Sequence, residues 1–87
     1  MDTLDRVRKI VARELELEAE EIRPEKAIMR DLGADSLSMM QIAMAVEEEF
    51  DISVEDHELE KLVTIKDVVR AVESKRPAAA SVYGLSD

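Results

Sequence analysis

Residues 36–50, SLSMMQIAMAVEEEF, decide the fold, because this stretch predicts one helix that is apolar around most of its circumference. Asp35 or Ser36 is the expected N-terminal cap of this helix. A helix that is apolar on nearly every side normally lies at the centre of a core. A chain of 87 residues is too small to bury all of it. Part of the helix surface is therefore expected to meet a partner or a ligand.

Amphipathic helices are predicted on either side of this central one. Apolar residues at helical spacing predict a first helix that starts at Asp2 or Thr3 and ends near Leu15–Leu17. The sequence TIKD at residues 64–67 predicts a capping box. The last helix is expected to follow that box and to end by Lys75–Arg76, where positive charges suit a helix C-terminus.

The remaining segments complete the expected architecture. Residues 18–34 show no clean period and predict a long connection. The apolar side chains expected to hold that connection on the core are Ile22, Ile28, Met29 and Leu32. A short helical turn is predicted around residues 55–61, and residues 77–87 are predicted to form a flexible tail. We therefore predict an all-α fold, a small antiparallel bundle of three main helices plus one short helix, within residues 1–76.

The charge of the chain is concentrated in its middle third. The formal net charge is −9, and residues 31–60 carry ten acidic side chains and no lysine or arginine. Such an acidic chain is a poor nucleic-acid binder, since phosphate contacts need basic side chains in excess. Two interpretations stay open for the acidic segment: a solvated face, or a docking surface that selects basic partners.

Several other classes of protein are excluded by composition. The chain has no cysteine, which removes disulfides, cysteine-ligated metals and thiol chemistry of its own. No run approaches the roughly 20 apolar residues that span a bilayer. The N-terminus, MDTLDRVRKI, has charges where a signal peptide needs apolar residues, so a cytoplasmic protein is expected.

The sequence also gives no support for a metal site or a catalytic site. The single histidine, His57, is expected to be an ordinary surface residue, and no serine–histidine–aspartate set stands out around it. The acidic segment 51–60 invites comparison with a calcium loop, but its sixth position is Asp56 where that loop needs glycine. No metal site and no catalytic residues are therefore predicted.

One serine stands where chemistry is possible. Gly33-Ala34-Asp35-Ser36-Leu37 delivers a serine to a helix N-terminus, where Ser36 is either a simple cap or the attachment point of a phosphate ester. Exposed helix N-termini favour an anion by only about 0.3–1 kcal/mol. A ligand presented there would therefore have to be covalently linked.

The sequence around Ser36 resembles that of bacterial acyl carrier proteins. DLGADSL at residues 31–37 is similar to the family's modification motif, and AVEEEF at 45–50 is similar to its acidic second helix. LDRVRKIVAREL near the N-terminus and TIKDVVRAVE near the C-terminus extend the resemblance over about residues 2–75.

The resemblance implies a carrier and not an enzyme. By similarity, Ser36 accepts 4′-phosphopantetheine from coenzyme A, installed by a separate phosphopantetheinyl transferase, and acyl intermediates then ride as thioesters on the arm. The carrier is expected to be a monomer in fatty-acid or related biosynthesis. Its partners would be acyl-processing enzymes, such as ketosynthases and acyltransferases, with basic docking patches. The residues expected to face these partners are Asp35, Leu37, Met40, Met44, Glu47 and Glu48.

The resemblance also implies a place for the cargo between the helices. An eight-carbon chain would gain roughly 6 kcal/mol if fully sequestered, at about 0.8 kcal/mol for each methylene. Ala43 and Ala45 are expected to leave room for it. The flexible methionines, Met39, Met40 and Met44, are either adaptable gap-fillers around the cargo or plain core residues.

Departures from the family pattern leave the pathway open. Ser38 and Gln41 stand where fatty-acid carriers usually have acidic residues, and Met39 and Met40 replace smaller neighbours. This loss of charge and gain of apolar surface can select different partners. The alternatives are a general fatty-acid carrier, a specialised carrier for a secondary lipid or polyketide, a peptidyl carrier, and a non-carrying interaction subunit with the same fold.

The acidic segment should make the stability of the fold depend on salt. Ten acidic side chains without a basic one in residues 31–60 repel one another, so the fold should be more stable when salt screens them. Thermal unfolding at low and at moderate salt should show a rising midpoint. An unchanged midpoint would contradict this prediction.

Overall fold

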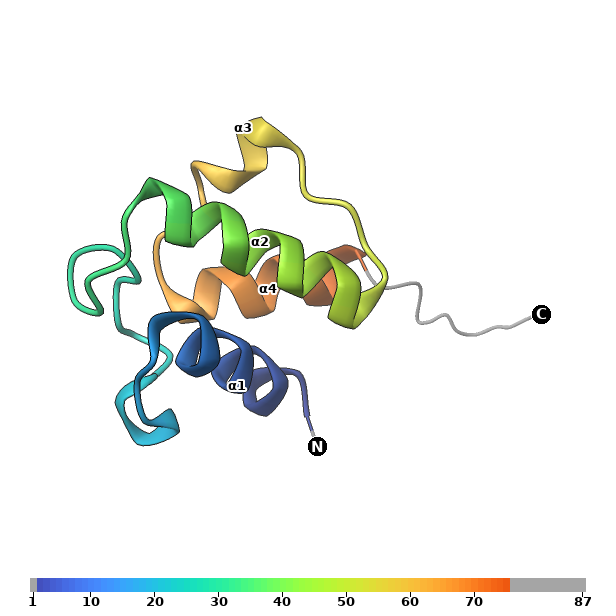
Figure 1. Cartoon of the computed structure of the whole chain (residues 1–87). Helices are drawn as coiled ribbons and strands as arrows, with labels where there is room; N and C mark the ends of the chain where they lie inside the picture. The colour runs from blue at the N-terminus through green and yellow to red at the C-terminus, as the bar shows by residue number, and fades with distance from the viewer. Residues whose placement is uncertain (1, 76–87) are drawn as a thin grey trace.

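The computed structural model of the protein describes residues 2–75 and confirms the predicted all-α architecture (Figure 1). The elements in chain order are α1 (Thr3–Leu15), the 3₁₀ helix η1 (Ala19–Glu21), α2 (Ser36–Phe50), α3 (Asp56–Leu59) and α4 (Ile65–Lys75). None of the helices in the described part of the chain is long and apolar enough to cross a membrane. The tail predicted for residues 77–87 lies outside the described residues, so the domain boundary stays a prediction.

Helix α1 is fixed at both ends by its own caps. The Asp2 side chain accepts a hydrogen bond from the backbone N–H of Asp5 at 2.9 Å, which identifies Asp2 as the cap of the first turn. The helix ends at Glu16, whose left-handed backbone (φ of 57°) lets its N–H reach the Ala12 carbonyl. The bounds thus agree with the sequence-based prediction to within two residues.

The core lies between α1, α2 and α4, with α1 packed against both of the others (Figure 1). Helices α1 and α4 each present one apolar face, as their spacing predicts. Helix α2 contributes Ile42 and Val46 to the core but leaves other apolar residues outside it. The largest fully buried side chains are Ile22, Ile28, Ile42, Ile65, Val7, Val11, Val68 and Val72.

The long connection before α2 is tied by its backbone to the link between α3 and α4. The N–H of Ile28 donates to the Val63 carbonyl at 2.8 Å, and the N–H of Ile65 donates to the Lys26 carbonyl at 3.1 Å. Between these bonds, Ala27 and Thr64 form an isolated antiparallel bridge. The predicted anchors Ile22 and Ile28 are completely buried, and Leu32 packs partly buried against the core.

Met29 does not serve as the fourth anchor. The prediction that it holds the connection on the core is wrong, because its side chain is 51% exposed. Its neighbour Ile28 already fills the core position, and Met29 lies in the turn of residues 28–32, where its carbonyl accepts the backbone N–H of Gly33. Met29 is left at the surface near the start of α2.

Helix α3 lies on the outside of the bundle (Figure 1) and is held there by Leu59, which packs against the core, and by polar contacts. The Lys75 ammonium of α4 reaches both carboxylate oxygens of Glu58, at 2.7 and 2.9 Å. Glu58 also accepts the N–H of Glu55, which closes a capping box on this four-residue helix. These hydrogen bonds, led by the one from Lys75, lower the pKa of Glu58 below its ordinary value.

We expect acid to loosen α3 through Glu58. Because the pKa of Glu58 is lower in the folded chain than in the unfolded one, its stabilisation is complete above the ordinary glutamate pKa and is lost as pH falls through the lowered value. The amide of Leu59, which donates to the Glu55 carbonyl, should then lose its protection from hydrogen exchange.

The substitution Lys75→Met should lower this protection already at neutral pH. Lys66→Met, which removes another α4 lysine, is the matched control and should leave Leu59 protected as in the wild type. Equal protection of Leu59 in the wild type and in Lys75→Met would contradict the role given to this ion pair.

Candidate functional site

The loop that leads into α2 is folded around one carboxylate. Asp31 Oδ2 accepts the backbone N–H of Ala27 at 2.9 Å, and this hydrogen bond is the main reason why the pKa of Asp31 is lowered. The N–H of Ala34 returns to the Ile28 carbonyl at 3.1 Å. Within this loop, Gly33 takes a left-handed φ of 82°, a conformation that glycine adopts without a steric penalty. The loop therefore presents the start of α2 in one defined position.

Asp35 is the cap of α2. Its Oδ1 atom accepts the backbone N–H of Ser38 at 2.8 Å, and this bond lowers the pKa of Asp35. Ser36 is then the first residue inside the helix and is exposed. Within residues 2–75 the Ser36 hydroxyl has no hydrogen-bond partner. The interpretation of Ser36 as a simple cap is therefore wrong, and its hydroxyl is free for another use.

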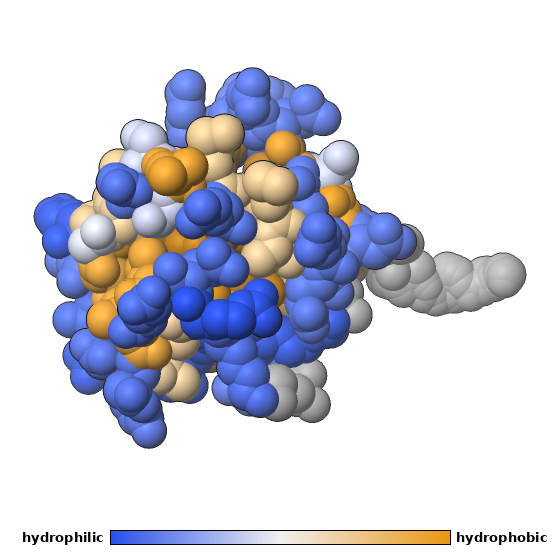
Figure 2. Space-filling view, viewed as in Figure 1, coloured by the Kyte–Doolittle hydropathy of each residue, from blue (hydrophilic) through white to orange (hydrophobic). Residues whose placement is uncertain are grey.

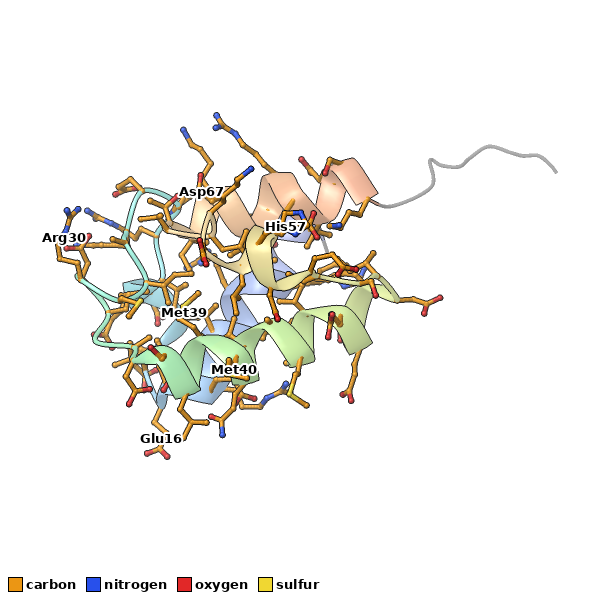
Figure 3. All side chains as sticks on the ribbon, turned by 90° about the horizontal axis from the view of Figure 1, so that it is seen from above. Glu16, Arg30, Met39, Met40, His57 and Asp67 are labelled. Atoms are coloured by element: carbon orange, nitrogen blue, oxygen red, sulfur yellow. The ribbon has the colours of Figure 1, made fainter. Side chains whose placement is uncertain are left out.

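A mostly apolar pocket of about 420 Å³ opens beside Ser36. It lies between the first turns of α2, the loop before it, and the segment that runs from α3 to α4. The buried Met39 and the exposed Met40 reach it from α2, and Figure 3 shows Met39 on the inner side of the helix. The lining residues are Ala27, Met29, Arg30, Ser36, Met39, Met40, Leu59, Glu60, Leu62 and Val63.

The lining differs in part from the sequence-based prediction. Met39 and Met40 line the pocket as expected, but Ala43 and Ala45 do not: Ala43 is buried and Ala45 packs against the core. The pocket instead gains residues from the long connection and from the α3–α4 link, among them Met29. In the sequence, the apolar pair Leu62–Val63 just before the capping box was the feature that indicated the part of the lining contributed by the α3–α4 link.

An exposed apolar stripe continues from the pocket along α2. Leu37 is 64% exposed, Met40 is 53% exposed and Met44 is 59% exposed. Their spacing of three and four residues places them on one face of the helix. Figure 2 shows apolar surface gathered over this part of the molecule and bordered by hydrophilic side chains. Exposed apolar residues grouped in this way mark an interaction site more often than isolated ones do.

The acidic run at the end of α2 is partly engaged within the fold. Glu47 is half-buried, and its carboxylate accepts the backbone N–H of Val54 at 2.7 Å. Glu49 forms an ion pair with Arg6 of α1 at 2.8 Å. Glu48, in contrast, is exposed between them. Of the two glutamates predicted to face partners, Glu48 is thus the more accessible.

Other chemistry finds little support among the described residues. Residues 2–75 contain no group of three or more histidine, cysteine, aspartate or glutamate side chains that could hold a metal ion. His57 is exposed on α3, as predicted. A free hydroxyl at a helix start, next to an apolar pocket, instead suits a covalently attached group with an apolar end.

Comparisons with known proteins agree with this geometry. A family model described as "Phosphopantetheine attachment site" matches residues 5–72. A curated acyl carrier protein from Helicobacter hepaticus is 42% identical over 76 residues, which are 87% of this chain and all of that protein. A solved structure of acyl carrier protein from Enterococcus faecalis superposes with a TM-score of 0.72 at 32% identity, covering 84% of this chain and 92% of that one.

The cofactor of this family fits the site described above. The arm of 4′-phosphopantetheine is joined to its protein through a phosphate ester, which needs an exposed hydroxyl, and Ser36 supplies one. The protein carries 4′-phosphopantetheine and acts as a carrier and not as a catalyst. With a family model that matches residues 5–72 and a 42% identical relative that is covered over its whole length, the chain belongs to the acyl carrier protein family.

Proposed function

We propose that Ser36 is the residue that carries the arm. A phosphopantetheinyl transferase would bond the Ser36 oxygen to the phosphorus that carries pantetheine, break the pyrophosphate bond of coenzyme A and release adenosine 3′,5′-bisphosphate, while a base of the transferase takes the serine proton. The observation that carries this proposal is the free Ser36 hydroxyl, released from capping by Asp35 and placed beside the pocket. The chain has no cysteine, so the reactive sulfur must come with the arm.

The pocket beside Ser36 is proposed to shelter the acyl chain. Its volume of about 420 Å³ is well above the ~150 Å³ of an apolar cavity that holds benzene. A medium-length acyl chain would therefore find room there. Met29, Met39 and Met40 are unbranched and polarisable, so they can repack around chains of different shape.

The exposed face of α2 is proposed to dock the enzymes that load and process the cargo. Leu37, Met40 and Met44 offer an apolar contact, whereas Asp35 and Glu48 offer charge. Ketosynthases and acyltransferases with a basic patch beside an apolar one would fit this face. The carrier would work as a monomer in the cytoplasm.

The pathway is proposed from the charge of α2. The helix has no charged residue from Ser36 to Val46, with Ser38 and Gln41 in place of acidic residues. Docking near the attachment point would thus depend more on apolar contact than it does in a carrier with acids there. The acidic run Glu47–Glu49 and the motif DLGADSL favour an acyl carrier, in fatty-acid synthesis or in a dedicated pathway for a related lipid or polyketide. Charging with an amino acid would instead identify a peptidyl carrier.

A second candidate function is an interaction subunit that carries no cargo. The apolar stripe of α2 supports it, because Leu37, Met40 and Met44 are exposed whether or not Ser36 is modified. In that case the variant Ser36→Ala would keep full function in the host. Loss of function in this variant would exclude the candidate.

Intact mass spectrometry tests the attachment site. Incubation with coenzyme A and a broad-specificity phosphopantetheinyl transferase should add one phosphopantetheine to the wild type and none to Ser36→Ala. The matched control is Ser38→Ala, one serine further along the same helix turn, which should be modified like the wild type. An arm on Ser36→Ala, or a folded wild type without one, would contradict the proposal.

Thermal unfolding tests the pocket. The octanoyl form should melt several degrees above the acetyl form, because buried methylenes contribute about 0.8 kcal/mol each and about 1 kcal/mol shifts the midpoint of so small a domain by some 4–8 °C.

A matched pair of variants tests whether the acyl chain lies in the pocket. Met40→Asp places a charge in the pocket lining and should remove most of the gain, whereas Met44→Asp lies outside the lining and should keep it. Equal midpoints for the octanoyl and acetyl forms of the wild type would contradict the proposed shelter.

A further inference from the structure

Arg30 is the one cation among the described residues that line the pocket beside Ser36. It directly precedes the segment 31–60, which has no lysine or arginine at all. Glu60, on the opposite wall, is the other charged residue of the lining. Figure 3 shows Arg30 at the end of the molecule where α2 begins, outside the core. A positive charge thus stands at the rim of a mostly apolar pocket, in a strongly acidic region.

The guanidinium of Arg30 is loosely held. Its side chain is 83% exposed, and its ion pair with Asp31 is long, 3.5 Å from Nε to Oδ1. Asp31 is itself fixed, because its other oxygen accepts the N–H of Ala27. Among the described residues, Asp31 is the one carboxylate that pairs with Arg30. The guanidinium can therefore turn about a fixed neighbour and offer its free N–H groups to another anion.

The phosphate of the arm is such an anion. As a diester it keeps one negative charge at neutral pH, and arginine binds phosphate oxygens with two parallel N–H groups. The positive end of the α2 dipole lies at Ser36 and also favours an anion there, although the Asp35 carboxylate already engages the backbone N–H groups of Leu37 and Ser38. Asp35 and Glu60, in contrast, would repel a phosphate at this place.

We propose that Arg30 pairs with the phosphate of the arm on Ser36 and so directs the arm over the mouth of the pocket. Arg30 is then a positioning residue: it touches the cofactor and favours the sheltered form of the cargo over the form exposed to solvent. The inference rests on the proposed attachment at Ser36. For an exposed ion pair, the expected bias toward the sheltered form is about 1.4-fold to fivefold.

NMR of the modified protein tests the pairing. In the wild type, the Nε–H resonance of Arg30 should move when the arm is added, and added salt should reverse the movement. The phosphorus resonance of the arm should change in Arg30→Gln and return toward the wild-type position in Arg30→Lys, which keeps the charge. Arg23→Gln is the matched control, because Arg23 is an exposed arginine that does not line this pocket and is paired with Glu25.

Two results would overturn the proposed pairing of Arg30 with the phosphate, and both can be distinguished from a failure of the proposed attachment at Ser36. If mass spectrometry shows the arm on Ser36 but the Arg30 resonance does not move, this inference is wrong and the carrier function stands. The same holds if Arg30→Gln and Arg23→Gln have the phosphorus resonance of the wild type. If no arm is added to the folded wild type, the proposed attachment fails and this inference fails with it.

Discussion

The bridge between the loop before α2 and the link before α4 is the contact on which the site depends. Ile28 donates to the Val63 carbonyl, Ile65 donates to the Lys26 carbonyl, and Ala27 pairs with Thr64 between them. These bonds join two segments that the sequence separates by more than thirty residues. Because Ile28 and Ile65 are also completely buried, the bridge is anchored in the core. The loop, the pocket walls and the start of α2 are thus held by one structural element.

The electrostatics of α2 follow from how its acids are placed. Acidic residues at a helix C-terminus are unfavourable because they add to the negative end of the helix dipole. The fold offsets part of this cost through Arg6, which pairs with Glu49, donates to the Glu49 carbonyl at 3.1 Å and lies 4.4 Å from the centre of the Phe50 ring. The first eleven residues of α2 carry no charge. The helix is therefore divided into an uncharged part that begins at Ser36 and an acidic part at its C-terminal end.

Most of the fold could be predicted from the sequence, because helical spacing and caps are local signals. The bounds of α2 and the capping box of Thr64 and Asp67 agree with the structure, where each of these two side chains accepts the N–H of the other residue. The choice between Asp35 and Ser36 as a cap could not be made, since both residue types cap helices well. Only the observed bond from Ser38 to Asp35 decides it.

The pocket could be predicted from the sequence only in part. Its walls come from three segments distant in the chain, and the pattern of residues 18–34 has no period from which the exposure of Met29 could be predicted. The same bridge that buries Ile28 turns Met29 outward and brings Val63 to the opposite wall. Burial and exposure in this loop are set by tertiary contact and not by local preference.

The most direct test of the account is to locate the cargo. Nuclear Overhauser contacts can be measured in the octanoyl form between the methylenes of the acyl chain and the methyl groups of the protein. We expect contacts to Met39, Leu59 and Leu62, which line the pocket beside Ser36. Contacts to Met44 alone, or no contacts to the protein at all, would contradict the claim that Ser36 stands at the mouth of a shelter for the chain it carries.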